Sequence, residues 1–311
     1  MIYPRLNRVR NGQRLSVELV NGLIKRTEYA GDLLRQGKCL AGTDVTVAQR
    51  YDGTTISGGW GRFRIIVQAT VGGIVKSFLY NGSTFTDIID PRATQTFAEG
   101  IDGVNIVGSS VVGGINRGFL YNGSTFTTLS VPLSSFTLPY GVDGSNIVGR
   151  TRLGSGFDRG FLYNGSTFTT FLVPSSTFTQ ALGIDGSNIV GQYRTINNVD
   201  RGFLYNGSTF TDIVPPNSTE TYSYGIDGSN IVGFARIGGI NRGFVYNGST
   251  FTDIFMPGSE GTIATGIYGS NIVGYASVGG VTRGFLYNGS TFTDIIYPGA
   301  TTTAAVGIDR N

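Results

Sequence analysis

The segment FLYNGSTFT at residues 119–127 recurs along the chain and decides the fold. It or a one-letter variant begins at six phenylalanines spaced 41 or 42 residues apart: Phe78, Phe119, Phe161, Phe203, Phe244 and Phe285. A second phrase, GIDGSNIVG or a close relative, precedes five of the six copies. Repetition at this period is typical of an array or a closed ring of small structural units. The repeat therefore indicates an architecture more directly than it indicates a function.

Turn signals divide one unit into four short strands. We predict these strands over residues 96–101, 105–111, 116–121 and 125–129. Asn122-Gly123 predicts a type I′ hairpin between the last two strands, because that turn needs positive φ at both positions. Asp102-Gly103 predicts a tight turn between the first two, where aspartate favours the turn by local hydrogen bonding and positive φ. Four strands joined in this way form an antiparallel blade.

The apolar residues of each unit run together rather than alternate, as in Ile106-Val107. Contiguous apolar residues indicate a strand whose two faces are both covered. Blades stacked around an axis meet this requirement, so the fold class is all-β: a six-bladed β-propeller, preceded by a short N-terminal α-helical anchor segment. The last unit stops after its first strand. We therefore expect residues 301–308 to pair with residues 64–70 and close the ring, leaving 54–58 as a linker.

Residues 1–58 lack the repeat, which occupies residues 59–311. Ser16 as an N-cap, apolar residues at spacings of three and four, and a glycine at the end predict an amphipathic helix over 17–36. Two interpretations remain open: a helix packed on its own domain, or a short oligomeric bundle that makes the protein a homo-oligomer. The segment is therefore interpreted as an anchor or oligomerisation element.

Composition excludes several classes of protein. The net charge is +3, with nine Lys/Arg against five Asp/Glu in residues 1–58, and there is no basic stripe of the kind that binds nucleic acid. A single cysteine, Cys39, rules out an internal disulfide. No apolar run reaches the length of a membrane span, and the N-terminus does not resemble a signal peptide. We expect synthesis in a cytoplasm, no membrane insertion and no cofactor.

The side chains offer little catalytic chemistry. The chain has no histidine, which excludes Ser-His-Asp and Cys-His sites and histidine-bound metals. Cys39 lacks a base to activate it. Two sets of aspartates recur, one before a turn glycine and one in the phrase TFTDI; both are interpreted as structural, not as metal ligands. The first set is Asp102, Asp143, Asp185 and Asp227, with Tyr268 in the fifth copy, and the second is Asp87, Asp212, Asp253 and Asp294. We predict no catalytic site, no metal site and no enzyme.

The copies differ mainly in the segment between the second and third strands and in the connection between units. In an antiparallel blade these lie at one end, so the variation gathers on one face of the ring, called here the variable face. Binding specificity is commonly placed on such loops, although unconstrained drift would produce the same pattern. The candidate binding residues, chosen because Arg and aromatic groups suit glycans, are Arg150, Arg152, Tyr193, Arg194, Phe234, Arg236 and Tyr275.

The phrases GSNIVG and GFLYNGSTFTDI resemble the repeats of HAF-type bacterial proteins over about 250 residues. The chain departs from that family in having glycine where the family has histidine before Phe, as at Gly118 and Gly160, and in lacking a secretion signal. Separately, YPRLNRVRNG at 3–12 resembles N-terminal segments of tailed-phage structural proteins.

These observations favour a phage virion appendage of the neck, tail or capsid fibre. Residues 1–58 would dock on phage structural proteins, and the propeller would be displayed on the virion to bind a host glycan or receptor. The alternative is a bacterial surface or secreted adhesion propeller. A glycan-active enzyme would need a cluster of acids, or of Tyr and Arg, on the variable face.

Overall fold

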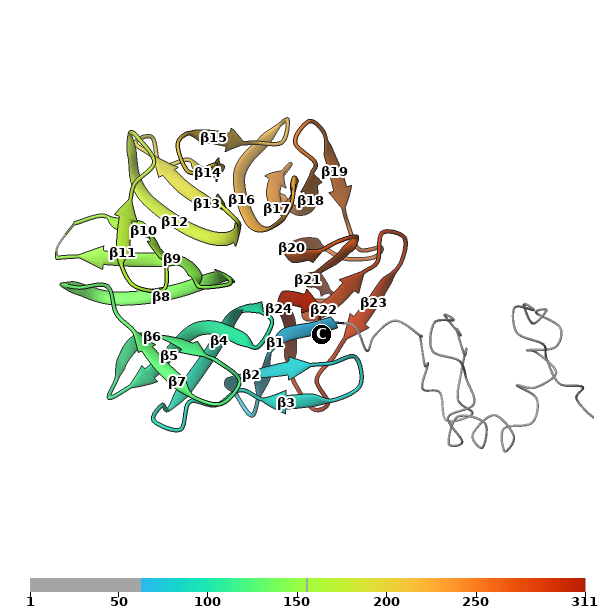
Figure 1. The fold of residues 1–311 in the computed structure, drawn as a ribbon. Helices are drawn as coiled ribbons and strands as arrows, with labels where there is room; N and C mark the ends of the chain where they lie inside the picture. The colour runs from blue at the N-terminus through green and yellow to red at the C-terminus, as the bar shows by residue number, and fades with distance from the viewer. Residues whose placement is uncertain (1–62, 155, 311) are drawn as a thin grey trace, which may run out of the picture. The chain divides into compact units, whose positions relative to one another are not determined.

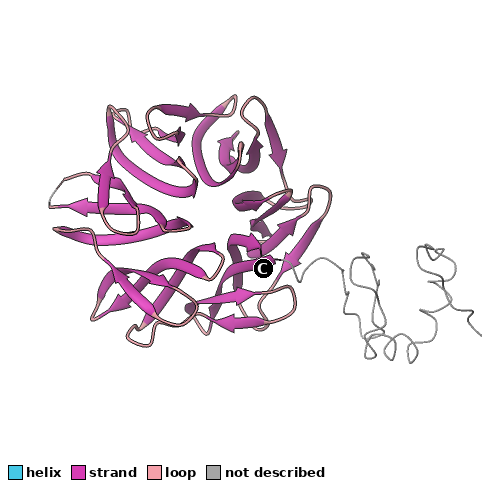
Figure 2. Cartoon of the chain, viewed as in Figure 1, coloured by secondary structure: helices cyan, strands magenta, loops and turns pink. Residues whose placement is uncertain are grey.

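The computed structural model describes residues 63–154 and 156–310. In this part of the chain, six four-stranded antiparallel sheets follow one another around a ring (Figure 1), and strands and turns make up the whole of it (Figure 2). The predicted six-bladed β-propeller is therefore confirmed. None of the described segments is a helix that could cross a membrane. The predicted helix 17–36 and linker 54–58 lie outside the described residues.

We number the blades 1 to 6 in chain order and give the strands of each from the centre of the ring outward. Blade 1 consists of β24 (Thr302–Arg310), β1 (Phe63–Val71), β2 (Ile74–Tyr80) and β3 (Phe85–Asp87). Blade 2 consists of β4 (Gln95–Asp102), β5 (Asn105–Val112), β6 (Ile115–Tyr121) and β7 (Phe126–Leu129). Blade 3 consists of β8 (Ser134–Asp143), β9 (Asn146–Leu153), β10 (Asp158–Tyr163) and β11 (Phe168–Phe171).

The other three blades repeat this order. Blade 4 consists of β12 (Ser176–Asp185), β13 (Asn188–Thr195), β14 (Asp200–Tyr205) and β15 (Phe210–Ile213). Blade 5 consists of β16 (Ser218–Asp227), β17 (Asn230–Ile237), β18 (Ile240–Tyr246) and β19 (Phe251–Ile254). Blade 6 consists of β20 (Gly261–Tyr268), β21 (Asn271–Val278), β22 (Val281–Tyr287) and β23 (Phe292–Ile295). The four strands predicted in blade 2 match the observed ones to within one residue.

Strand β24 closes the ring, as predicted. It pairs antiparallel with β1 over eight positions, from Phe63 opposite Arg310 to Thr70 opposite Thr302. The two strands lie side by side in Figure 1 although they come from opposite ends of the described chain. Because β24 supplies the missing inner strand of blade 1, no blade is left incomplete.

The residues of the FLYNGSTFT motif form one hairpin, and several have a structural role in it. Its first phenylalanine is at most 3 % exposed in every copy and packs between sheets. In blade 2, the Tyr121 hydroxyl donates a hydrogen bond to the Gly123 carbonyl, and the Asn122 Oδ1 accepts from the backbone N–H of Ser124 and Thr125. Only the glycine has positive φ, so the predicted two-residue type I′ turn is wrong. The asparagine side chain instead caps a four-residue loop.

Adjacent residues of each second strand bury their side chains in different clusters. Ile106 packs with Phe119, whereas Val107 packs with Phe161 of the next blade. Both faces of the sheet are therefore covered, as the contiguous apolar residues indicated.

Six glycines line the central channel, one on each inner strand, each next to a β-bulge in the pairing with the second strand. They are Gly100, Gly141, Gly183, Gly225, Gly266 and Gly307. A Cβ on any of them would lie 2.3–3.3 Å from the nearest backbone atom of the following blade. The inner strands approach one another this closely because these positions carry no side chain.

Candidate functional site

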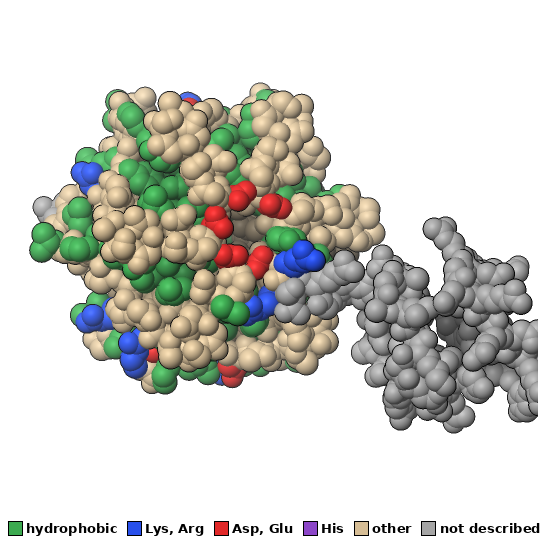
Figure 3. Space-filling model, in the orientation of Figure 1, with side chains coloured by type: hydrophobic (Ala, Val, Ile, Leu, Met, Phe, Trp, Pro, Cys, Tyr) green, Lys and Arg blue, Asp and Glu red, His purple; other side chains and the backbone are tan. Residues whose placement is uncertain are grey.

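Five aspartates near the ends of the inner strands tie the blades to one another. The Asp102 carboxylate accepts a hydrogen bond of 2.6 Å from the Gly144 N–H, in the hairpin of the next blade. The same bond joins Asp143 to Gly186, Asp185 to Gly228, Asp227 to Gly269, and Asp309 to Gly103. Acidic side chains gather around the central opening in Figure 3. The prediction that these aspartates form local hydrogen bonds is wrong, because each bond crosses to the neighbouring hairpin. The predicted positive φ of the aspartate is also wrong, because φ is positive at the following glycine.

Tyr268 takes the aspartate position in blade 6 for a topological reason. The next blade is blade 1, whose first two strands come from opposite ends of the chain, so no hairpin N–H is there to bind a carboxylate. Tyr268 packs edge-on against Phe63 instead, with ring centroids 6.2 Å apart. Among residues 63–154 and 156–310, no group of acidic or Cys side chains is arranged to hold a metal ion.

The second set of aspartates lies on the outer strands, and three of the four pair with arginines of the third strands. Arg201 lies 3.1 Å from Asp212, and Arg283 lies 3.6 Å from Asp294. Arg242 and Asp253 form the same pair in blade 5. These pairs are solvent-exposed, so each contributes at most about 1 kcal/mol.

Two of the predicted binding residues are buried in contacts with other side chains. Tyr193 is 7 % exposed, and its hydroxyl donates to Asp212 at 2.7 Å. Phe234 is 8 % exposed and stacks on Tyr222 with centroids 4.7 Å apart. Their aromatic character belongs to the packing of blades 4 and 5, a role that the loop comparison could not separate from binding.

Three of the predicted arginines are held by buried aspartates on the variable face. Arg150 and Arg152 both pair with Asp158, at N–O distances of 3.3 and 2.5 Å. Arg194 forms a two-point contact with Asp200 at 2.8 and 2.9 Å. Rings also cover these groups: Arg150 lies over Phe136 and Phe178, and Arg194 lies over Phe178. Each of these arginines therefore has an aspartate partner within its own blade.

The remaining two predicted residues, Arg236 and Tyr275, line the same cavity between blades 5 and 6. Its volume is 370 Å³, within the range typical of small-molecule sites. Around it lie a carboxylate, a guanidinium, an amide, hydroxyl groups and apolar side chains: Arg236, Gly239, Ile240, Asn241, Glu260, Gly261, Ile263, Tyr275, Ser277 and Thr282. Arg236 is only loosely paired with Glu220, at 4.0 Å. Its guanidinium therefore keeps donors free for a ligand.

Glu260 is the acidic group of this cavity, and sequence reasoning missed it. Its carboxylate accepts hydrogen bonds from Ser277 Oγ at 2.5 Å and from the Gly280 N–H at 3.2 Å. These bonds, the one from Ser277 foremost, lower the pKa of Glu260, so the group stays ionised at neutral pH. Burial instead raises the pKa of Tyr275, which keeps its hydroxyl protonated.

The connection that leads into blade 6 differs from the other connections at two positions beside this cavity. At the positions of Glu260 and Gly261, the other blades carry Ser or Thr followed by a residue with a side chain, such as Phe136, Phe178 or Glu220. The equivalent cavity between blades 2 and 3, which Phe136 lines, is smaller at 220 Å³, so the glycine enlarges this space. A Cβ added at Gly261 would find its nearest neighbour at 3.4 Å, and φ is not positive there. The aligned Glu-Gly pair was the sequence signal that could have located the site.

Glu99 faces the central channel, where a cavity of 90 Å³ is lined by the glycines of the inner strands and their neighbours. Glu99 is partly exposed to the channel, and its carboxylate accepts a hydrogen bond of 3.1 Å from Gln68 Nε2. Burial raises the pKa of Glu99 to about 7, and the bond from Gln68 opposes that shift only in part.

Glu99→Gln is expected to stabilise the propeller at pH 8 but not at pH 4.5. Between pH 4.5 and about 7 the folded chain retains a proton that the unfolded chain has lost, so ionisation of Glu99 lowers stability as pH rises through this window. The amide removes that penalty, by about 1–2 kcal/mol once access of channel water is allowed for. Urea unfolding of both proteins at the two pH values measures it. An equal difference at both values would show that Glu99 does not titrate in this window.

Comparisons with known proteins bear on the fold. No protein-family model and no curated protein sequence matches the chain, so the HAF-type resemblance rests on its motifs alone. Among solved structures, the six-bladed fungal lectin of Aleuria aurantia shares 16% identity over 78% of this chain and 92% of its own, with a TM-score of 0.51. The SapL1 lectin in complex with α-methyl fucoside shares 16% over 76% and 93%, with a TM-score of 0.50. A chain of the nidogen/laminin complex shares 12% over 79% and 97%, with a TM-score of 0.52. These identities show a shared fold and no more.

Proposed function

We propose that the protein is a carbohydrate-binding propeller and that the cavity between blades 5 and 6 holds one sugar residue of a glycan. The observation that carries this proposal is the meeting of Glu260 and Arg236 with the Tyr275 ring around a space that Gly261 leaves open. A sugar presents hydroxyl groups along its edge and C–H groups on its faces. Charged groups form strong hydrogen bonds with the hydroxyls, and aromatic or aliphatic side chains cover the C–H face.

The groups of the cavity are matched to that chemistry. The Glu260 carboxylate can only accept and the Arg236 guanidinium can only donate, so together they can bind neighbouring hydroxyls. Asn241 does both. Ile263 and Tyr275 supply apolar surface beside them. Two of the similar propellers are lectins described with fucose or a fucoside, which supports a sugar site on this fold without placing one here.

A binding role agrees with the alternative of a surface or secreted adhesion propeller at least as well as with a phage appendage. Display on a virion, docking on phage structural proteins and homo-oligomerisation all depend on residues 1–58. These residues lie outside the described part of the chain, so each of the three stays a prediction. The absence of histidine leaves an acyl-transfer triad without its usual base.

Gly261→Phe is expected to weaken sugar binding while leaving the fold intact. Phenylalanine occupies the equivalent position in blades 3 and 4, as Phe136 and Phe178, so the blade accepts it. The cavity that Phe136 lines measures 220 Å³ against 370 Å³ here, so the added ring is expected to narrow the sugar cavity. Saturation-transfer NMR with α-methyl fucoside and the methyl glycosides of galactose, mannose and glucose would identify the bound sugar. Titration would then show a loss of affinity of at least about tenfold.

Gly261→Ala is the matched control, because its methyl group meets only ordinary contacts and leaves most of the volume open. Glu260→Thr, which restores the residue found in four other blades, is expected to weaken binding by about tenfold without filling the cavity. Binding to no glycoside of the panel, or equal binding by wild type and Gly261→Phe, would contradict the proposed site.

A further inference from the structure

Blade 2 carries a second polar cavity, of 190 Å³, that is distinct from the one between blades 5 and 6. It is lined by Asp90, Arg92, Ser110, Val112, Arg117, Gly118 and Thr128. Asp90 and Arg92 belong to the connection that leads from blade 1 into blade 2, and the others belong to β5, β6 and β7. Two guanidinium groups against one carboxylate leave the cavity with a net charge of +1.

Asp90 is the first feature found in this blade alone. The equivalent positions of the other blades are occupied by Val131, Val173, Pro215, Met256 and Tyr297. The Asp90 side chain is 1 % exposed and binds Arg92 through two bonds of 2.9 Å. The Arg92 guanidinium lowers the pKa of Asp90, so the buried carboxylate remains charged. The buried carboxylate therefore fixes the orientation of the Arg92 guanidinium.

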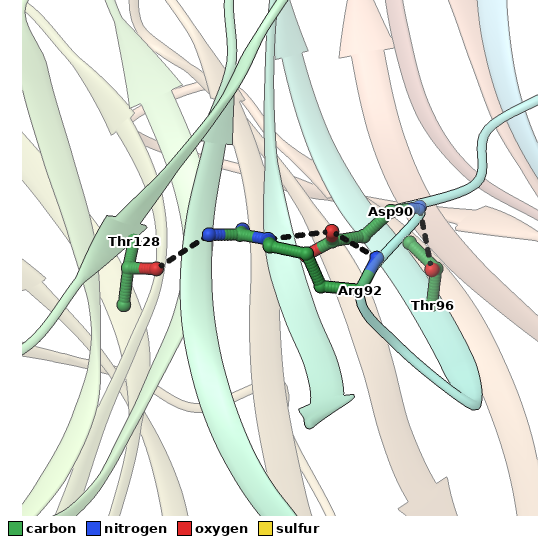
Figure 4. A network of polar contacts seen from close by, with 4 residues as sticks. All are labelled: Asp90, Arg92, Thr96 and Thr128. Carbon is green, nitrogen blue, oxygen red and sulfur yellow. Dashed lines mark hydrogen bonds and ion pairs between the residues drawn. The ribbon is translucent and has the colours of Figure 1, made fainter. Parts of the chain in front are cut away.

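The Arg92 side chain extends across the cavity. Figure 4 shows its guanidinium extending from Asp90 toward Thr128, whose Oγ1 accepts a hydrogen bond of 3.3 Å from Nη1. The Asp90 N–H donates to Thr96 Oγ1, which holds the start of the connection in place. One edge of the guanidinium is thus bound to Asp90, and the other lies at the cavity.

Arg117 is the second feature of this cavity, and what distinguishes it from Arg159 of blade 3, which also faces a threonine, is the Asp90–Arg92 pair beside it. In blades 4, 5 and 6 the equivalent arginine pairs with an aspartate of the outer strand. In blade 2 that aspartate is replaced by Thr128, and within the described residues the Arg117 side chain makes no ion pair or hydrogen bond. A guanidinium without its carboxylate, beside a second guanidinium, favours a negatively charged group from outside the chain.

Ser110 supplies a further donor at the floor of the cavity. Its hydroxyl is buried, with the residue 1 % exposed, and has no hydrogen-bond partner. It lies near enough to Asp90 to contribute to the lowered pKa of that group, but not in hydrogen-bonding geometry. Buried hydroxyls normally have a partner, so its proton is available to a ligand in the cavity.

We propose that this cavity binds the oxyanion of an acidic ligand, whether a sulfate or phosphate group or a sugar carboxylate. Arg117 and Arg92 would contact its oxygens, with Ser110 and Thr128 as hydroxyl partners. The volume accommodates one such group. This site does not depend on the sugar cavity between blades 5 and 6, and either can exist without the other.

The test uses the full chain and inorganic sulfate and phosphate, titrated at constant ionic strength against chloride. Arginine Nε–H signals in NMR spectra give a local readout. We expect saturable shifts of Arg92 and Arg117 with sulfate or phosphate. Thr128→Asp restores the carboxylate of blades 4 to 6 and is expected to weaken binding by at least about tenfold. Thr170→Asp makes the same change in blade 3, beside Arg159, and is expected to leave binding unchanged.

The absence of saturable shifts, or an equal loss in both aspartate variants, would overturn the proposal. If Thr128→Asp does not fold, Arg117→Gln with Arg159→Gln as its control gives the same comparison. Glucose 6-sulfate and glucuronate, each measured against glucose, then distinguish an ester group from a carboxylate. Gly261→Phe is expected to bind the oxyanion as wild type does, so failure of the sugar site and failure of this one remain distinguishable.

Discussion

Ending the chain at Thr301 is expected to abolish cooperative folding of the propeller. The truncation removes β24, which pairs with β1 over eight positions and buries Thr303, Ala305 and Ile308. It also removes the hydrogen bond between Asp309 and the Gly103 N–H and leaves blade 1 without its inner strand. Each buried backbone group left without a partner costs about 1–3 kcal/mol, so the sum exceeds the total stability of about 5–15 kcal/mol usual for a domain. Circular dichroism during urea unfolding measures the loss.

A rearranged chain provides the control for this truncation. Residues 302–309 followed by Gly-Ser are inserted before Arg64, so that blade 1 gains the ordinary hairpin found in blade 4 at Asp185 to Asn188. Cooperative unfolding should return, because the same strand reaches the same partner by a local turn. A truncated chain that unfolds as cooperatively as wild type would show that ring closure contributes little.

Gly100→Ala is expected to destabilise the propeller by about 2–3 kcal/mol. A Cβ at Gly100 would lie 2.3 Å from the Tyr140 carbonyl oxygen and 3.2 Å from Gly141 Cα. Both atoms are backbone of the adjacent blade, so the clash can be relieved only by moving one blade away from the next. The loss of unfolding free energy is measured from the urea midpoint, provided that the slope m of free energy against urea concentration is unchanged.

Gly261→Ala serves as the control for this change also, because it adds the same methyl group where the nearest atom is 3.4 Å away. It is expected to change stability by less than about 0.5 kcal/mol. A similar loss in both variants would attribute the effect to β-strand propensity rather than to the contact between blades.

The fold could be predicted from the sequence because its determinants are local and repeated. Six copies of one motif marked the strands, and the unpaired first strand at the C-terminus indicated the closure with β1. The Asn122-Gly123 turn was assigned wrongly, because the asparagine side chain caps a longer loop that the dipeptide rule does not consider. The aspartates before the turn glycines form hydrogen bonds within the fold, as the structural interpretation expected, but their partners lie in the next blade.

The candidate site was predicted only in part. Comparison of the copies selected Arg236 and Tyr275, which line the cavity, but also Tyr193 and Phe234, which are buried in the packing. It missed Glu260, although the Glu-Gly pair departs from the pattern of the other blades. Variation between copies shows where a loop is free to change. It does not show whether the side chain points to solvent, to a neighbouring blade or into a cavity.

By itself the sequence determined the number of blades, the strands of each and the way the ring closes, because turn chemistry and strand burial act over a few residues. The tertiary structure decided what happens between blades. It directed five aspartates to the neighbouring hairpin, opened a cavity beside Gly261 and brought Arg92 across to Thr128. These features depend on atoms about 40 residues apart in the chain. Such contacts arise only when two blades are pressed together, since no local rule specifies which side chains then face the gap.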